Sequence, residues 1–145
     1  MRWVLTESSA IFHRWTLLSA EPLAELKYTL ESKSVRIHFE HKRLFFLEPQ
    51  KPFQQKLIIK SEYGMAIASI DLPKSAGMGS INIDGNLLYF DIYNSAIHLF
   101  GKDRLPLTQC QIEPFDDISS NELTALAFSY AWIYQQDKTK KTVSL

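Results

Sequence analysis

The stretch His38-Phe39-Glu40-His41 places two imidazoles and a carboxylate close together, and these groups bind zinc or act as general acids and bases. Apolar and polar residues alternate around it, which predicts a β-strand. On a strand, His38 and Glu40 share one face while His41 points to the other. A metal site would need a bend and a further ligand, so we interpret the stretch as a solvated strand end and turn. An enzyme, a hydrolase or a metal-dependent one, that uses His38, Glu40 and His41 is the least favoured alternative.

The other reactive residue types stand alone in the sequence. Cys110 has no neighbouring base or cation to activate its thiol, and alternation predicts a buried structural position. Asp116 and Asp117 precede an expected helix, where negative charge is favourable without any catalytic role. His13 is not paired with a nucleophile. We therefore assign no catalytic residue and expect no metal and no cofactor.

Lys42 and Arg43 form the best local basic group, and Phe45 or Phe46 could lie beside them as exposed aromatic residues. Lys42, Arg43 and Phe45 are the predicted ligand-binding residues. The formal net charge is +0 and the pI is about 6.9, so the chain has no overall field that attracts nucleic acid. Two cations give little affinity for a nucleic acid or a phospholipid headgroup.

Period-two patterning runs from Trp3 to about Glu113, in short segments divided by Gly, Pro, Asn, Asp and Ser. This pattern is typical of antiparallel strands with one buried face. The strongest signal covers residues 81–89, where Asp84-Gly85 suits a tight hairpin turn. We expect a mainly β domain with short connections.

The pattern becomes helical after Pro114. Ser119 and Glu122 match a capping box, which predicts a helix over about residues 119–136. Nearly every residue from Leu123 to Tyr134 is apolar, so this helix should be enclosed on all sides. The apolar stretch is shorter than the ~20 residues needed to span a bilayer. We expect a single domain over residues 1–136 and a flexible tail over 137–145.

Two segments carry a family resemblance. One is Lys56-Leu57-Ile58-Ile59-Lys60 followed by Glu62-Tyr63-Gly64-Met65-Ala66-Ile67-Ala68; the other is Asn121-Glu122-Leu123-Thr124-Ala125-Leu126-Ala127-Phe128-Ser129-Tyr130. The chain resembles the tubby C-terminal-like fold of tubby proteins, LURP-one-related proteins and phospholipid scramblases. The resemblance implies a closed antiparallel barrel of about twelve strands around a central helix, and a binding or scaffolding role. The chain shows no dense basic cluster, palmitoylation segment or calcium loop, so lipid binding and scrambling are not implied.

These observations favour a non-enzymatic binding or scaffolding module whose partner is an unknown protein or a lipid-like ligand. A lipocalin-like carrier of a small molecule or lipid is the alternative, and it requires the helix to lie outside the barrel mouth. The single cysteine cannot form an internal disulfide, which favours the cytoplasm. The oligomeric state stays open.

Overall fold

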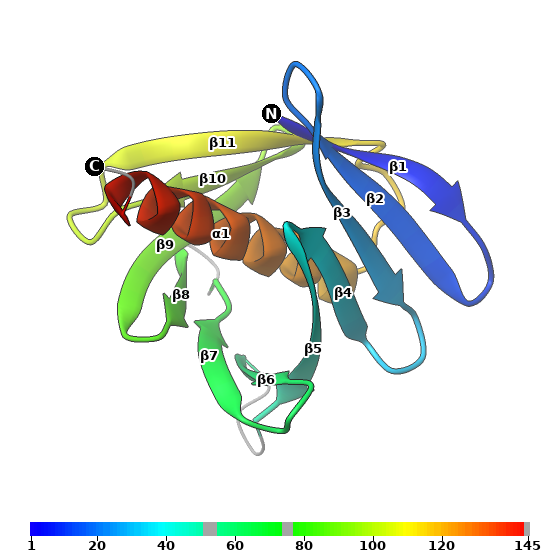
Figure 1. Cartoon of the computed structure of the whole chain (residues 1–145), viewed down its shortest axis with the longest axis horizontal. Helices are drawn as coiled ribbons and strands as arrows, with labels where there is room; N and C mark the ends of the chain where they lie inside the picture. The colour runs from blue at the N-terminus through cyan, green and yellow to red at the C-terminus, as the bar shows by residue number, and fades with distance from the viewer. Residues whose placement is uncertain (51–54, 74–76, 144–145) are drawn as a thin grey trace.

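The structure is a computed structural model that describes residues 1–50, 55–73 and 77–143, with side chains up to residue 138. The described residues form a strand-rich domain followed by one long helix (Figure 1). The strands are β1 (Arg2–Ser8), β2 (Phe12–Leu18), β3 (Pro22–Thr29), β4 (Ser34–Phe39), β5 (His41–Pro49), β6 (Lys56–Ser61), β7 (Ala66–Asp71), β8 (Gly79–Ile83), β9 (Asn86–Tyr93), β10 (Ala96–Phe100) and β11 (Pro106–Glu113). The helix is α1 (Ser120–Val143).

The strands close into a barrel in which each strand pairs with the next one along the chain. Every consecutive pair is antiparallel, as predicted, whereas β1 and β11 close the barrel in parallel register. The barrel has eleven strands, one fewer than the resemblance implies. Because direction alternates along an odd number of strands, the first and last point the same way. Closure gives each of these strands a hydrogen-bonded neighbour on both sides.

The tightest predicted hairpin is confirmed between β8 and β9. Asp84 and Gly85 have φ angles of 50° and 83°, and Ile83 pairs with Asn86 across the turn. Positive φ at both turn positions matches the right-handed twist of the two strands, which explains the Asp-Gly sequence. The turn at Gly64, with φ 77°, likewise joins β6 to β7 as the sequence indicates.

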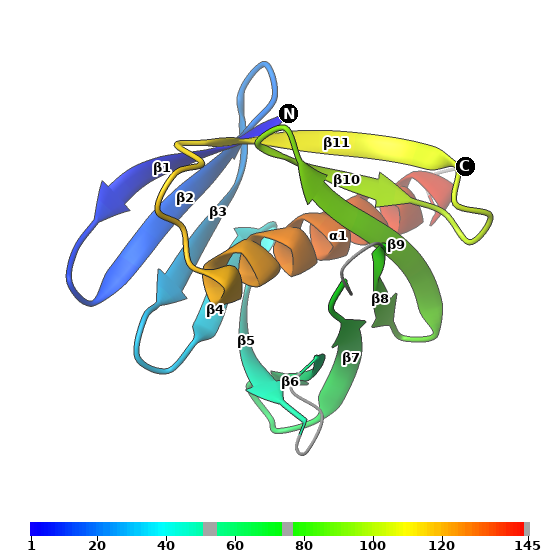
Figure 2. The same cartoon turned by 180° about the vertical axis from the view of Figure 1, so that it is seen from behind.

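The helix α1 runs through the barrel, and both views show strands surrounding it (Figures 1 and 2). All residues from Thr124 to Ile133 are buried, which covers more than two helical turns on every face. Phe128 is 0% exposed and Trp132 is 7% exposed. The expectation of an enclosed apolar helix is therefore confirmed. The carrier alternative required a helix outside the barrel mouth, and the structure instead places it in the lumen.

The helix is longer than predicted, because it continues through Val143 instead of ending near residue 136. It therefore includes most of the segment that the sequence predicts to be a tail; the flexibility of that segment stays a prediction. No helix in the described part of the chain is both long and apolar enough to cross a membrane.

Alternation along the strands separates the core from the outer surface. On β4, Val35 and Ile37 are fully buried, while Arg36 and His38 are exposed. Strand geometry requires this, since successive side chains point to opposite faces of the sheet. The outer faces of β2–β5 therefore display the polar residues of four neighbouring strands side by side.

Candidate functional site

Three cations lie in a row across the outside of the barrel. Arg14 on β2 is directly opposite Lys27 on β3, and Lys27 is directly opposite Arg36 on β4. Neighbouring strands are about 4.8 Å apart, so the row spans about 10 Å. Like charges directly opposite each other destabilise a sheet. The fold tolerates this arrangement here, and a bound anion would relieve it.

A second row lies beside the first and crosses β3, β4 and β5. Glu25 on β3 is opposite His38 on β4, and His38 is opposite Lys42 on β5. The two rows surround a hollow of about 260 Å³, which we call the basic hollow. Its lining residues are Arg14, Glu25, Leu26, Lys27, Arg36, His38 and Lys42.

The cations of the basic hollow are only slightly neutralised. Arg14 pairs with Glu7 at 3.1 Å on the exposed surface. Among the described residues, Lys27, Arg36 and Lys42 form no ion pair with a carboxylate, and Glu25 forms none with a cation. The hollow therefore carries an excess of positive charge although the whole chain is neutral.

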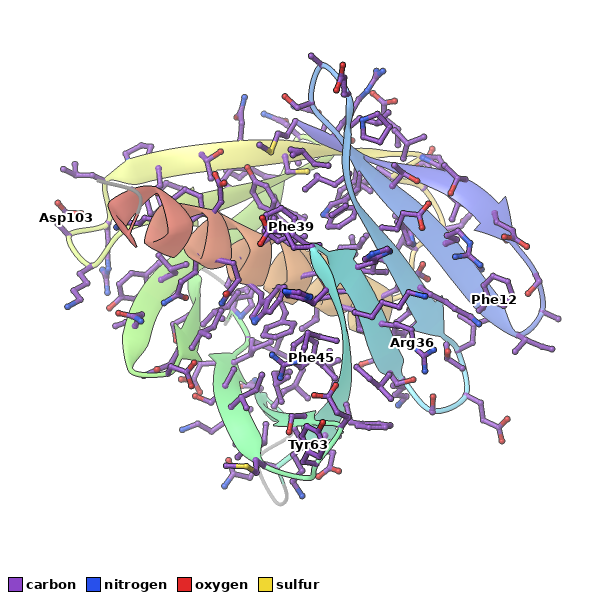
Figure 3. All side chains as sticks on the ribbon, viewed as in Figure 1. Phe12, Arg36, Phe39, Phe45, Tyr63 and Asp103 are labelled. Carbon is purple, nitrogen blue, oxygen red and sulfur yellow. The ribbon has the colours of Figure 1, made fainter. Side chains whose placement is uncertain are left out.

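An aromatic ring holds part of the first row in place. The Lys27 ammonium lies 4.5 Å from the Phe12 ring centroid, and the Arg14 guanidinium carbon lies 5.6 Å from it. Both are cation–π contacts, which fix side chains without cancelling their charge. Phe12 and Arg36 lie on the same flank of the molecule, over β2–β4 (Figure 3).

Of the predicted ligand-binding residues, Arg43 and Phe45 lie together, with the Arg43 guanidinium carbon 5.2 Å from the Phe45 ring centroid, whereas Lys42 lies apart from Phe45. Only Lys42 lines the basic hollow. Arg43 donates to Glu62 over 3.1 Å. The prediction of Phe45 as an exposed aromatic residue is wrong: it is 0% exposed and packs against Phe128 and Trp132, with ring centroids 5.4 and 5.5 Å away. Residues three apart on a strand face opposite sides, which separates Lys42 from Phe45.

The histidines considered for metal or acid–base chemistry are also separated. His38 lines the basic hollow, whereas Glu40 and His41 line a smaller hollow of about 110 Å³ beside Arg43 and Trp132. The described residues contain no group of three side chains that could hold a metal ion. The hairpin between β4 and β5 thus places His38 in a different hollow from Glu40 and His41.

A buried carboxylate, which the sequence did not reveal, links the helix to the barrel wall. Glu122 is 2% exposed. Its carboxylate accepts a hydrogen bond from Trp15 Nε1 at 2.7 Å, and it lies 2.8 Å from His13 Nδ1. Burial, followed by the nearby Glu122 charge, raises the pKa of Tyr28. The Glu122 backbone N–H donates to Ser119 Oγ at 3.2 Å, so one half of the predicted capping box forms. The carboxylate serves to anchor the helix to β2.

Cys110 is fully buried, in agreement with the sequence prediction. Burial raises the pKa of its thiol to about 12. A thiol that stays protonated at neutral pH is not a nucleophile.

The fold and the site define a closed barrel that contains its own C-terminal helix and carries a basic hollow on its outer surface. No protein-family model, no curated protein and no solved structure matches this chain.

Proposed function

We propose that this protein is a non-enzymatic binding module that holds a compact, multiply charged anionic group in the basic hollow. The single observation that carries the proposal is the directly opposed row of Arg14, Lys27 and Arg36. A row of like charges lowers the stability of the free sheet, so it favours any ligand that supplies the opposite charge.

The size and chemistry of the hollow favour a phosphate-type ligand. A volume of about 260 Å³ suits a small group such as two or three linked phosphates. Arginine presents forked donors that match phosphate oxygens, and lysine adds point charge from either side. Glu25, the one carboxylate among the described lining residues, repels any anion, but four cations surround it, so the attraction exceeds the repulsion.

The tubby-like resemblance supports the module part of the proposal. A closed barrel around a C-terminal helix is the architecture that the resemblance implies, and the filled lumen leaves the outer surface as the place for a partner. We therefore place the chain with tubby-like and LURP-one-related barrels as a proposal. A cytoplasmic location stays a prediction from the single cysteine.

Isothermal titration of the full chain with sodium tripolyphosphate tests the proposal. We expect saturable binding of one equivalent that weakens as salt rises, because the contacts are charge-based. Lys42→Glu should weaken binding by about tenfold, since it reverses a charge at the hollow. Lys42 is exposed, so the variant should fold.

The matched control is Lys102→Glu, which makes the same change of net charge at an exposed turn between β10 and β11. Its affinity should stay within about twofold of the original, because screened charges at a distance contribute little. Equal losses in both variants would show non-specific attraction and would overturn the proposal, as would an absence of binding at low salt.

A further inference from the structure

A second hollow lies beside the first turn of the helix and shares no lining residue with the basic hollow. It has a volume of about 770 Å³, and we call it the entrance groove. Its lining residues are Leu72, Pro73, Gly77, Met78, Phe90, Asp91, Ile92, Ser120, Leu123 and Thr124. Most of these side chains are apolar, which is the usual lining of a small-molecule site.

The groove exists because β8 is short. The pairing of β8 with β9 ends at Gly79 and Phe90, so Asp91 and Ile92 extend beyond the end of their neighbour. The first turn of α1 lies across this gap and contributes Ser120, Leu123 and Thr124. The groove is therefore built into the strand lengths of the barrel.

The floor of the groove depends on a glycine. A Cβ at Gly79 would collide with the ring of Phe90 and would lie 2.8 Å from the Asp71 carbonyl oxygen. Glycine, which has no Cβ, lets the Phe90 ring approach the β8 backbone this closely. Phe90 is 1% exposed, so its ring is held in the core beneath the groove.

Of the lining residues that the structure describes, Asp91 is the one with an ionisable side chain. Its Oδ1 accepts a hydrogen bond at 2.8 Å from the Ile92 backbone N–H, on the part of β9 that extends past β8. Within the described ranges, Asp91 forms no ion pair, and its Oδ2 has no hydrogen-bond partner. A half-buried carboxylate with a free oxygen beside apolar walls favours a cation as its partner.

The geometry points to a binding site for a small amphiphilic amine, whose apolar part lies on Ile92 and Leu123 and whose ammonium pairs with Asp91. This ligand is a cation, whereas the ligand proposed for the basic hollow is an anion. Each proposal can therefore be tested without the other. The positive end of the α1 dipole opposes a cation here, but the Glu122 carboxylate in the first turn offsets it.

Three probes of equal chain length test the site: octylamine, octanol and octanoate, each added to uniformly ¹⁵N-labelled full chain and followed by amide chemical shifts. Octylamine should shift the Asp91, Ile92 and Leu123 amides in a saturable way. Octanol should bind about fivefold more weakly, because it lacks the ion pair. Octanoate should bind more weakly still.

Asp91→Asn removes the charge while the amide oxygen still accepts from the Ile92 N–H, so the variant should fold. Octylamine affinity should fall by about fivefold to that of octanol, and octanol binding should not change. Glu21→Gln is the matched control at an exposed loop and should alter neither. Equal binding of octylamine and octanol, stronger binding of octanoate, or no shifts in the groove would each overturn the proposal.

Discussion

Trp15 donates a hydrogen bond from its indole Nε1 to the Glu122 carboxylate over 2.7 Å. This bond joins β2 to the first turn of α1, and both side chains are almost completely buried. His13, two residues before Trp15, contacts the same carboxylate. The inner face of β2 thus anchors the helix, while its outer face carries Arg14 of the basic hollow.

Removing the carboxylate should destabilise the protein. Glu122→Ala leaves the Trp15 N–H buried without a partner, so we expect a loss of about 2 kcal/mol in the free energy of unfolding. Glu122→Gln keeps an acceptor oxygen and should lose less. Urea unfolding measures both, with the exposed Glu21→Ala as control. Equal stability of Glu122→Ala and Glu21→Ala would show that the anchor contributes nothing.

Phe45 should behave as a core residue and not as a ligand-binding one. Phe45→Leu removes edge contacts with Phe128 and Trp132, and we expect a loss of about 1–2 kcal/mol. Phe46→Leu, on the neighbouring and less buried position, should cost less. Thermal and urea unfolding give both values. A Phe45→Leu variant of unchanged stability but weaker tripolyphosphate binding would reverse this assignment.

Cys110 should resist labelling in the folded protein. Its thiol is 0% exposed and its pKa is raised to about 12, so at pH 8 almost no accessible thiolate exists. A thiol-reactive dye should label it only as fast as the protein unfolds, and at once in denaturant. Rapid labelling of the native chain at pH 8 would contradict the buried position.

The Arg43–Glu62 pair should give a pH-dependent contribution to stability. The Leu44 backbone N–H, followed by the Arg43 charge, holds the pKa of Glu62 below its ordinary value of 4.5. A lowered carboxyl pKa stabilises the folded state above that ordinary value, and the contribution is lost as pH falls through the folded pKa. Glu62→Gln should therefore cost about 1 kcal/mol at pH 7. The difference from the original chain should disappear in strong acid; a difference independent of pH would contradict this cause.

The barrel and its helix could be predicted because both depend on local patterns. The Asp84-Gly85 turn, the alternation at Val35 and Ile37, and the apolar helix each follow from neighbouring residues. The parallel pairing of β1 with β11 follows only from the odd number of strands. That number is hard to count from the sequence, because the strands are short and irregular.

The basic hollow could not be predicted because it depends on register. Arg14, Lys27 and Arg36 are distant in the sequence and meet only when three strands pair in one alignment. Lys42 and Arg43 are adjacent in the sequence, so sequence alone favours them instead. Their neighbour Phe45 could have been excluded, since its alternation with Leu47 already indicated the core face.

Glu122 shows a second limit of prediction from the sequence. Its sequence position matches a capping box, and its backbone does take part in the cap. Its side chain turns to the buried donors of β2, which only the tertiary fold places nearby. Capping the helix and bonding to β2 have similar energies for such a side chain. Which of the two forms therefore depends on the donors that the rest of the fold places nearby.

The most direct test of anion binding in the basic hollow is an amide chemical-shift map of the ¹⁵N-labelled full chain titrated with tripolyphosphate. We predict saturable shifts that are contiguous over Arg14, Lys27, Arg36 and Lys42. Lys102 on the far turn should not shift. Shifts spread over exposed lysines without a maximum at the hollow, or centred on another face, would contradict the account.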